Sequence, residues 1–225
     1  MFPEKLAERT ELGVFAYSRL GYGGSDPAPL PRPHNYLDDE AALLPAVLDA
    51  AGIRAFILLG HSDGGSIAAV YAGLHADDRL RGVVLIAPHV IIEDLTVAGI
   101  RATAAAFQHG DLRARLARYH GTNTDIAFAG WHDLQTDPQL LTWNARSALK
   151  RLTAPVLIIQ GDADPYGSLE QVRVLQEDAP QAEALVLPGC GHAPHLERQE
   201  AVLVAIADFT AGRGSFGARP EAHHP

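Results

Sequence analysis

The stretch from Leu58 to Ala68, L-L-G-H-S-D-G-G-S-I-A, places Ser62 between a histidine and an aspartate and frames it with three glycines. Glycine lacks a Cβ and tolerates positive φ, so glycines this close together indicate a sharp turn or closely approaching backbones. The apolar run before the turn, residues 55–59, is typical of a buried parallel strand. After the turn, apolar residues recur at helical spacing, at Ile67, Val70 and Tyr71. The sequence therefore predicts a strand, a tight turn that carries Ser62, and a helix.

A serine on such a turn projects beyond the sheet edge, beside the N-terminus of the following helix. Unpaired N–H groups and the positive end of the helix dipole favour negative charge there. The sequence G-H-S-D-G matches the G-x-S-x-G pattern of a nucleophile elbow. That pattern also arises by chance, but its position between a predicted strand and a predicted helix favours the functional interpretation.

Further apolar runs along the chain resemble the one before Ser62. They are residues 13–17, 83–87, 156–160 and 184–187. Segments with helical spacing separate most of these runs, at residues 38–50, 66–75, 168–177 and 200–209. Strands that alternate with helices, without hairpin turns, predict an α/β fold with a mostly parallel sheet flanked by helices on both faces. In such sheets the chemistry lies at the carboxyl ends of the strands.

The alternation of predicted strands and helices is interrupted once, which divides the chain into a core and one insertion. Residues 1–91 and 151–211 are assigned to the core, whereas residues 92–150 show helical patterns and no convincing strand. An insertion that follows the carboxyl end of a strand would lie over Ser62, so we interpret it as a helical lid; a simple packing extension is the alternative. Residues 212–225 are rich in glycine, proline and polar residues, which predicts a disordered tail.

Composition narrows the class of protein. The formal net charge of −9 argues against a nucleic-acid-binding surface, and the arginines of residues 111–120 fit a solvated helix face. A single cysteine, Cys190, cannot form an internal disulfide, and we interpret it as a small buried residue. No run approaches the roughly 18 apolar residues of a membrane helix. The N-terminus lacks the apolar segment of a secretory signal. We therefore expect a cytoplasmic protein whose partner is a small molecule and neither nucleic acid nor membrane.

Two other predicted strands lead into residues that a serine nucleophile requires. One leads into G-D-A-D-P-Y-G, which holds Asp162 and Asp164, and the other leads into P-G-C-G-H-A-P-H, which holds His192 and His195. A serine nucleophile needs a general base, and the base needs an orienting acid. The chain order of serine, acid and histidine is the one expected when the serine follows a strand-turn-helix elbow. The sequence therefore predicts that these strand ends meet at one catalytic site.

These motifs resemble those of the α/β-hydrolase family. G-H-S-D-G matches the nucleophile motif, G-D-A-D-P the acid loop and C-G-H-A-P-H-L-E the histidine loop, and R-L-G-Y-G-G-S-D at residues 19–26 is similar to the turn after the family's fourth strand. The resemblance implies a serine hydrolase, without cofactor or metal, that cleaves a small-molecule ester or related acyl bond through an acyl-enzyme. By the same resemblance Ser62 is the nucleophile, Asp164 the acid with Asp162 as the alternative, and His192 the base. The backbone N–H of Asp63 is implied as an oxyanion donor.

The residues around the nucleophile suggest a substrate preference. S-D-G-G is similar to the sequence of biphenyl-hydrolase-like esterases, which favour amino-acid esters, so the Asp63 carboxylate is a candidate to receive a cationic group of the substrate. The alternative is that this carboxylate only complements the helix N-terminus. The candidate substrate-binding residues are His61, Asp63, Trp131 and Trp143.

The resemblance also implies strands that this sequence does not contain. Residues 13–17 match the family's fourth strand, and the residues before them look like the end of the preceding helix. The His-Gly segment that usually marks the second oxyanion donor is not found. We therefore expect an N-terminally incomplete core, through a truncated or misassigned start or as a variant whose sheet closes differently. The competing functional hypothesis is a non-catalytic ligand-binding member or an inactive truncated hydrolase.

Overall fold

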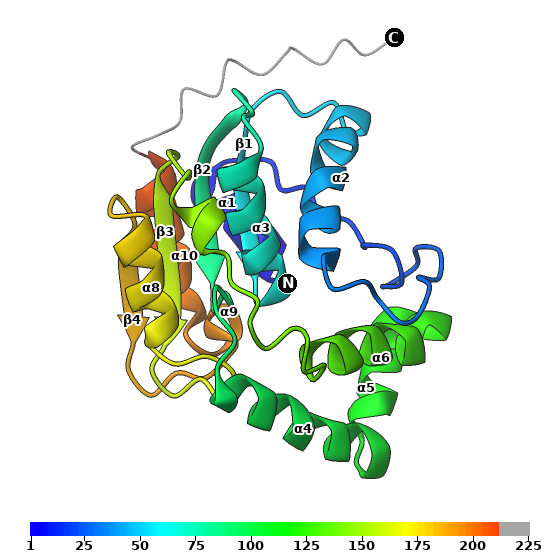
Figure 1. The fold of residues 1–225 in the computed structure, drawn as a ribbon. Coiled ribbons are helices and arrows are strands. Elements are labelled where there is room, and N and C mark those ends of the chain that lie inside the picture. Colours follow the sequence, from blue (N-terminus) through cyan, green and yellow to red (C-terminus); the bar gives the residue numbers. More distant parts are fainter. Residues whose placement is uncertain (212–225) are drawn as a thin grey trace, which may run out of the picture.

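The computed structural model describes residues 1–211, and its centre is a parallel four-stranded sheet (Figure 1). In spatial order the strands are β1 (Phe56–His61), β2 (Leu80–Ile86), β3 (Val156–Gly161) and β4 (Glu183–Leu187). Each neighbouring pair is parallel, so all four carboxyl ends lie at the same edge of the sheet. The predicted α/β fold with a parallel sheet is confirmed.

Helices cover both faces of the sheet. One face carries α2 (Tyr36–Ala50), α3 (Asp63–Leu74), α7 (Arg146–Leu149) and α8 (Glu170–Asp178), and the other carries α1 (Phe2–Thr10) and α10 (Gln199–Ala211). The short helix α9 (Pro194–Glu197) precedes α10. The predicted helices at residues 38–50, 66–75, 168–177 and 200–209 all coincide with helices of the structure.

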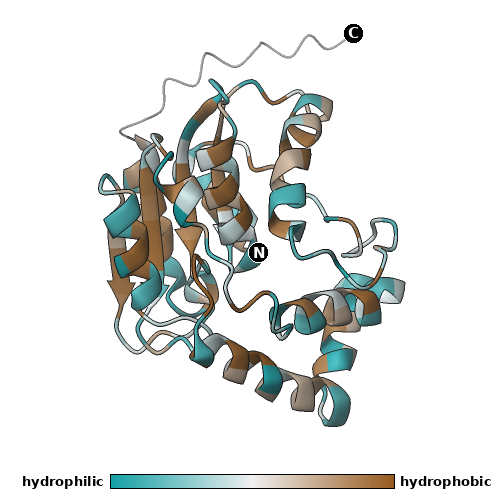
Figure 2. Ribbon diagram, viewed as in Figure 1, coloured by the Kyte–Doolittle hydropathy of each residue, from teal (hydrophilic) through white to brown (hydrophobic). Residues whose placement is uncertain are grey.

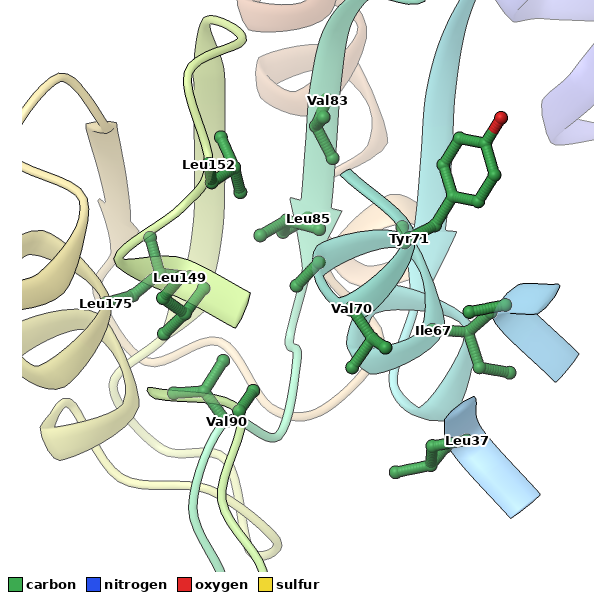
Figure 3. Close-up of a cluster of buried hydrophobic side chains, with 14 of the residues drawn as sticks. Leu37, Ile67, Val70, Tyr71, Val83, Leu85, Val90, Leu149, Leu152 and Leu175 are labelled. Carbon is green, nitrogen blue, oxygen red and sulfur yellow. The ribbon is translucent and has the colours of Figure 1, made fainter. Parts of the chain in front are cut away.

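The core consists of two apolar clusters, one on each face, because successive side chains of a strand point to opposite sides. Val83 and Leu85 of β2 belong to the larger cluster, together with side chains of α3 and α7 (Figure 3). Val84 and Ile86 belong to the smaller cluster, which includes Leu6 of α1. The strands are accordingly hydrophobic along most of their length, as their brown colour in Figure 2 shows. Burial of both faces anchors the carboxyl ends of the strands in a rigid frame.

The predicted insertion, residues 92–150, is helical, but its last helix, α7, packs with the core on one face of the sheet. It contains α4 (Asp94–His109), α5 (Leu112–His120), the 3₁₀ turn η1 (Gly121–Asn123) and α6 (Thr124–Gln135). These helices extend beyond the carboxyl ends of the strands (Figure 1). An isolated antiparallel bridge between Ile91 and Asn144 joins the two ends of the insertion. In the described part of the chain, no helix has the combination of length and apolar character that crossing a membrane requires.

The prediction of a strand at residues 13–17 is wrong. This segment has no regular secondary structure, and the side chains of Val14, Phe15 and Tyr17 are 42%, 51% and 40% exposed. An apolar groove with a volume of about 900 Å³ is lined by this segment on one side and by β1 on the other. A strand needs a neighbour that satisfies its backbone N–H and C=O groups. The apolar pattern is present, but within residues 1–211 the segment does not pair with the edge strand β1, because the groove lies between them.

Candidate active site

Ser62 sits on the turn between β1 and α3 with φ 55° and ψ −124°. Positive φ is unfavourable for a residue with a Cβ and costs on the order of 1–3 kcal/mol, so the surroundings must enforce it. The Ser62 N–H donates to the carbonyl oxygen of Ile86 at 2.9 Å, and the Ser62 carbonyl accepts from the Gly65 N–H at 2.8 Å. The predicted strand, turn and helix are thus confirmed, and the serine is held at the carboxyl edge of the sheet.

Two of the three glycines around Ser62 are closely packed. A Cβ on Gly60 would collide with the backbone of Gly64, and a Cβ on Gly65 would lie 3.1 Å from the Cβ of Pro88. Gly64 differs, because a Cβ there would meet no atom within 4 Å. Close approach of β1 and α3 therefore explains Gly60, and the proximity of Pro88 explains Gly65, but Gly64 is left without a packing reason.

The structure brings together the serine, the histidine and the acid that the motifs indicate. His192 Nε2 lies 2.9 Å from Ser62 Oγ, and His192 Nδ1 lies 2.8 Å from Asp164 Oδ2. Because the carboxylate accepts a hydrogen bond from Nδ1, the neutral imidazole presents an unprotonated Nε2 to the serine hydroxyl. This arrangement can remove a proton from Ser62 while the carboxylate stabilises the imidazolium that forms.

Asp164 is held in place by three donors. Besides His192, the Tyr166 N–H donates to Oδ1 at 2.8 Å, and Gln160 Nε2 donates to Oδ2 at 2.9 Å. Burial would by itself raise the pKa of Asp164, but the hydrogen bond and charge of His192, together with the Tyr166 and Gln160 donors, lower the pKa below its usual value. The carboxylate is therefore ionised at neutral pH, as an orienting acid requires.

The alternative acid and the second histidine lie elsewhere. Asp162 is exposed and accepts a hydrogen bond from the Gly189 N–H at 2.7 Å, which shapes the loop. The His195 ring packs against the rings of Phe2 and His61, at centroid distances of 5.5 and 4.6 Å. Neither side chain has a hydrogen bond to the Ser62–His192 pair among the described contacts. Cys190 is fully buried, as predicted.

The Asp63 side chain is engaged by two other parts of the fold. The carboxylate is 7% exposed and accepts hydrogen bonds from the Tyr36 hydroxyl of α2 and, at 3.0 Å, from Gln135 Nε2 at the end of α6. Arg19 Nη1 in turn donates to the Tyr36 hydroxyl oxygen at 3.3 Å. Burial and the nearby Asp63 charge raise the pKa of Tyr36 well above its usual value, so this hydroxyl stays protonated and donates.

Tyr166 is a neighbour of the site that the sequence analysis did not single out. Its ring centroid lies 4.7 Å from that of His192, and its hydroxyl is 2.6 Å from Thr103 Oγ1 of α4. Trp131 of α6 lies next to it, with ring centroids 6.5 Å apart, whereas Trp143 packs against the larger core cluster. The structure therefore connects Trp131 to the site through Tyr166 and places Trp143, partly buried, against the core. The sequence signal that could have predicted the contact of Tyr166 with His192 is the position of Tyr166 in the acid-loop sequence G-D-A-D-P-Y-G, two residues after Asp164.

Two further histidines lie around His192. The His89 ring stacks near His192 at 5.8 Å and is buried, and His61 Nε2 lies 2.7 Å from the backbone carbonyl oxygen of His192. Burial lowers the pKa of both His61 and His89. Within residues 1–211, no group of three or more His, Cys, Asp and Glu side chains is arranged to hold a metal ion.

Comparisons with known proteins show which proteins this chain resembles. The model of the "Alpha/beta hydrolase family" matches residues 1–206. The chain is 30% identical over 184 residues to "Esterase YbfF" from Escherichia coli, an alignment that covers 72% of this chain and 70% of that protein. A solved structure of a proline iminopeptidase from Mycobacterium smegmatis superposes with a TM-score of 0.70 at 21% identity, covering 94% of this chain and 85% of that one.

A second relative is far longer than this chain. The chain is 30% identical over 231 residues to "Polyketide synthase ThaQ" from Burkholderia thailandensis, which covers 91% of this chain but 11% of that protein. The chain thus spans about a tenth of the length of this relative.

Proposed function

The chain belongs to the alpha/beta hydrolase family, and on that premise we propose that it is a serine hydrolase that cleaves a small-molecule ester or related acyl bond through an acyl-enzyme. The observation that carries the proposal is the unbroken series of hydrogen bonds from Ser62 through His192 to Asp164. The name of the Escherichia coli esterase supports an ester among the possible acyl compounds.

The proposed reaction has two halves. Ser62 Oγ attacks the substrate carbonyl carbon while its proton passes to His192 Nε2, and Asp164 stabilises the resulting imidazolium. Collapse of the tetrahedral intermediate breaks the bond to the leaving group, which takes that proton from Nε2. A water molecule then loses a proton to His192 Nε2 as it attacks the acyl carbon. The second tetrahedral intermediate collapses, the bond from Ser62 Oγ to the acyl carbon breaks, and Oγ takes the proton back from Nε2 as the acid product leaves.

We assign the backbone N–H of Asp63 as a donor to the oxyanion. Asp63 is the first residue of α3, and the first N–H groups of a helix have no acceptor within the helix. The positive end of the helix dipole adds to the stabilisation of negative charge at this point. A single donor of this kind is typically worth about a hundredfold or more in rate.

The Asp63 carboxylate is better explained as a structural group than as a site for a cationic substrate. Both of its oxygens already accept hydrogen bonds, from Tyr36 and from Gln135. A substrate ammonium group would have to compete with these donors in a buried position. We therefore propose that this side chain joins the turn after Ser62 to α2 and to α6.

We further propose that the helices α4, α5 and α6 act as a lid over Ser62. Tyr166 supports this assignment, because it contacts His192 on one side and Thr103 of α4 on the other. Trp131 is the tryptophan best placed to touch a substrate, since its ring lies beside Tyr166.

Covalent labelling tests the proposed function. The protein is incubated with a fluorophosphonate probe, and its intact mass is measured for the wild type, for Ser62→Ala and for Ser147→Ala, which removes an exposed serine of α7. We expect one adduct on the wild type and on Ser147→Ala, and none on Ser62→Ala. Absence of an adduct on folded wild-type protein would overturn the proposal and favour a non-catalytic member of the family.

A further inference from the structure

We propose that His61 is a positioning residue, whose side chain fixes the backbone of His192 and thereby holds the general base over Ser62. The inference rests on the proposed function. His61 is the last residue of β1 and directly precedes Ser62. Its Nε2 lies 2.7 Å from the backbone carbonyl oxygen of His192. A carbonyl oxygen can only accept, so Nε2 carries the proton and donates it to this bond.

The loop that carries His192 is tied to the loop after β3, because the Ala163 N–H donates to the Cys190 carbonyl oxygen at 3.0 Å. The loop of His192 follows β4 and has no regular secondary structure before α9. Glu197 of α9 accepts from the Gly191 N–H at 2.7 Å and from the Ala193 N–H at 3.1 Å, which ties the loop to the helix that follows it. The bond from His61 adds a link to the strand that carries the nucleophile. Ser62, which carries Oγ, is therefore linked through its neighbour His61 to the backbone of His192, which carries Nε2.

Packing fixes the orientation of the His61 ring. Its centroid lies 4.9 Å from that of His192 and 4.6 Å from that of His195. Burial, and then the proximity of His192, lowers the pKa of His61 to about 4, so the imidazole is neutral at pH 7 and has one N–H group. The bond to the His192 carbonyl determines that this N–H group is Nε2–H. The sequence predicts that His61 binds substrate, which would require a free Nε2–H group. In the structure this group donates to the His192 carbonyl oxygen instead.

Three substitutions of His61 separate the effect of the donated hydrogen bond from the effect of side-chain size. In His61→Gln the amide nitrogen reaches as far as Nε2 of histidine and can donate, in His61→Asn the amide is shorter, and in His61→Leu no donor remains. The control is His195→Leu, which removes the other ring beside His61 and leaves the bond to His192 in place. The kcat and KM for 4-nitrophenyl acetate and the rate of fluorophosphonate labelling are measured on folded protein, with folding followed by near-ultraviolet circular dichroism.

We expect His61→Leu and His61→Asn to lower kcat and the labelling rate by about ten- to a hundredfold with little change in KM, because displacing a reacting group by on the order of 1 Å costs up to ~100-fold. His61→Gln should recover most of that loss, and His195→Leu should stay nearer to the wild type than His61→Leu does. If His61→Leu does not fold, the comparison of kcat between His61→Gln and His61→Asn tests the positioning role.

Other outcomes overturn the positioning role. A rise in KM with unchanged kcat in His61→Asn would show a substrate-binding residue. Equal activity of His61→Gln and His61→Asn would show that the donated hydrogen bond has no effect on catalysis. A wild-type protein that forms no adduct refutes the proposed function itself, which is a separate result.

Discussion

Acidification should destabilise this protein through His61. The pKa of His61 is about 4 in the folded protein and about 6.5 in the unfolded chain, because burial and the neighbouring His192 disfavour the charged ring. Below pH 6.5 the unfolded chain binds a proton that the folded protein does not. The stabilisation is therefore fully present above the unfolded pKa, decreases as the pH falls from about 6.5 to about 4, and is constant below that range.

The magnitude follows from the two pKa values. Each pKa unit between folded and unfolded states is worth about 1.4 kcal/mol, so the complete effect is about 3 kcal/mol, and acidification from about pH 7.5 to about pH 4.5 realises about 2.5 kcal/mol of it. The rings of His192 and His195 and the Asp164 carboxylate face the same region. Burial also lowers the pKa of His89 and His195, so the total loss of the wild type exceeds the part that belongs to His61.

Urea unfolding at the two pH values isolates the His61 contribution. The free energy of unfolding is measured from tryptophan fluorescence for the wild type, for His61→Gln and for His109→Gln, which replaces an exposed histidine of α4. We expect His61→Gln to lose about 2.5 kcal/mol less than the wild type on acidification, and His109→Gln to lose as much as the wild type. An equal loss in the wild type and in His61→Gln would refute the reasoning.

Further substitutions test the elbow, the acid and Asp63. Gly60→Ala should lower the free energy of unfolding by about 1–3 kcal/mol or more, because the added Cβ would collide with the backbone of Gly64. Gly64→Ala should leave the free energy of unfolding unchanged or raise it by up to about 1 kcal/mol, because its Cβ would meet no atom. Thermal unfolding of the two variants measures the difference. Gln160→Leu should cost about 1.5–3 kcal/mol in urea unfolding and lower kcat, because Asp164 loses a donor to a charged oxygen. Asp63→Asn should reduce turnover of neutral and cationic esters by the same factor; a selective loss on cationic esters in a steady-state assay would restore the ammonium-binding hypothesis.

The parts of the site that could be predicted are those that local sequence determines. The apolar run, the glycines and the helical spacing around Ser62 predict one continuous strand, turn and helix. Parallel strands then bring the residues after β3 and β4 to the same edge, which is why Asp164 and His192 meet Ser62 although they lie far along the chain. Steric demand at Gly60 reinforces the pattern, since no other residue fits there.

The contacts that could not be predicted join side chains without any shared pattern. Asp63 is bonded by Tyr36 and Gln135, which lie 27 and 72 positions away and belong to two different helices. Tyr166 reaches α4 through its hydroxyl group, at Thr103, and through its backbone carbonyl oxygen, which accepts from Thr96. Periodicity shows which face of a helix is apolar, but it does not show which polar residue on one element meets which on another.

Residues 13–17 show a second limit of prediction from sequence, and this segment borders the candidate active site. An apolar run indicates a segment suited to a sheet, but a strand forms only beside another strand. The hydrogen-bonded side chains of Ser62, His192 and Asp164 follow strands β1, β4 and β3 of one paired sheet, and residues 13–17 are not part of that sheet. The groove along β1, in contrast, reaches the elbow at Gly60, His61 and Gly64. The groove therefore borders His61, the residue that we propose positions His192, so the two parts of the fold meet at this side chain.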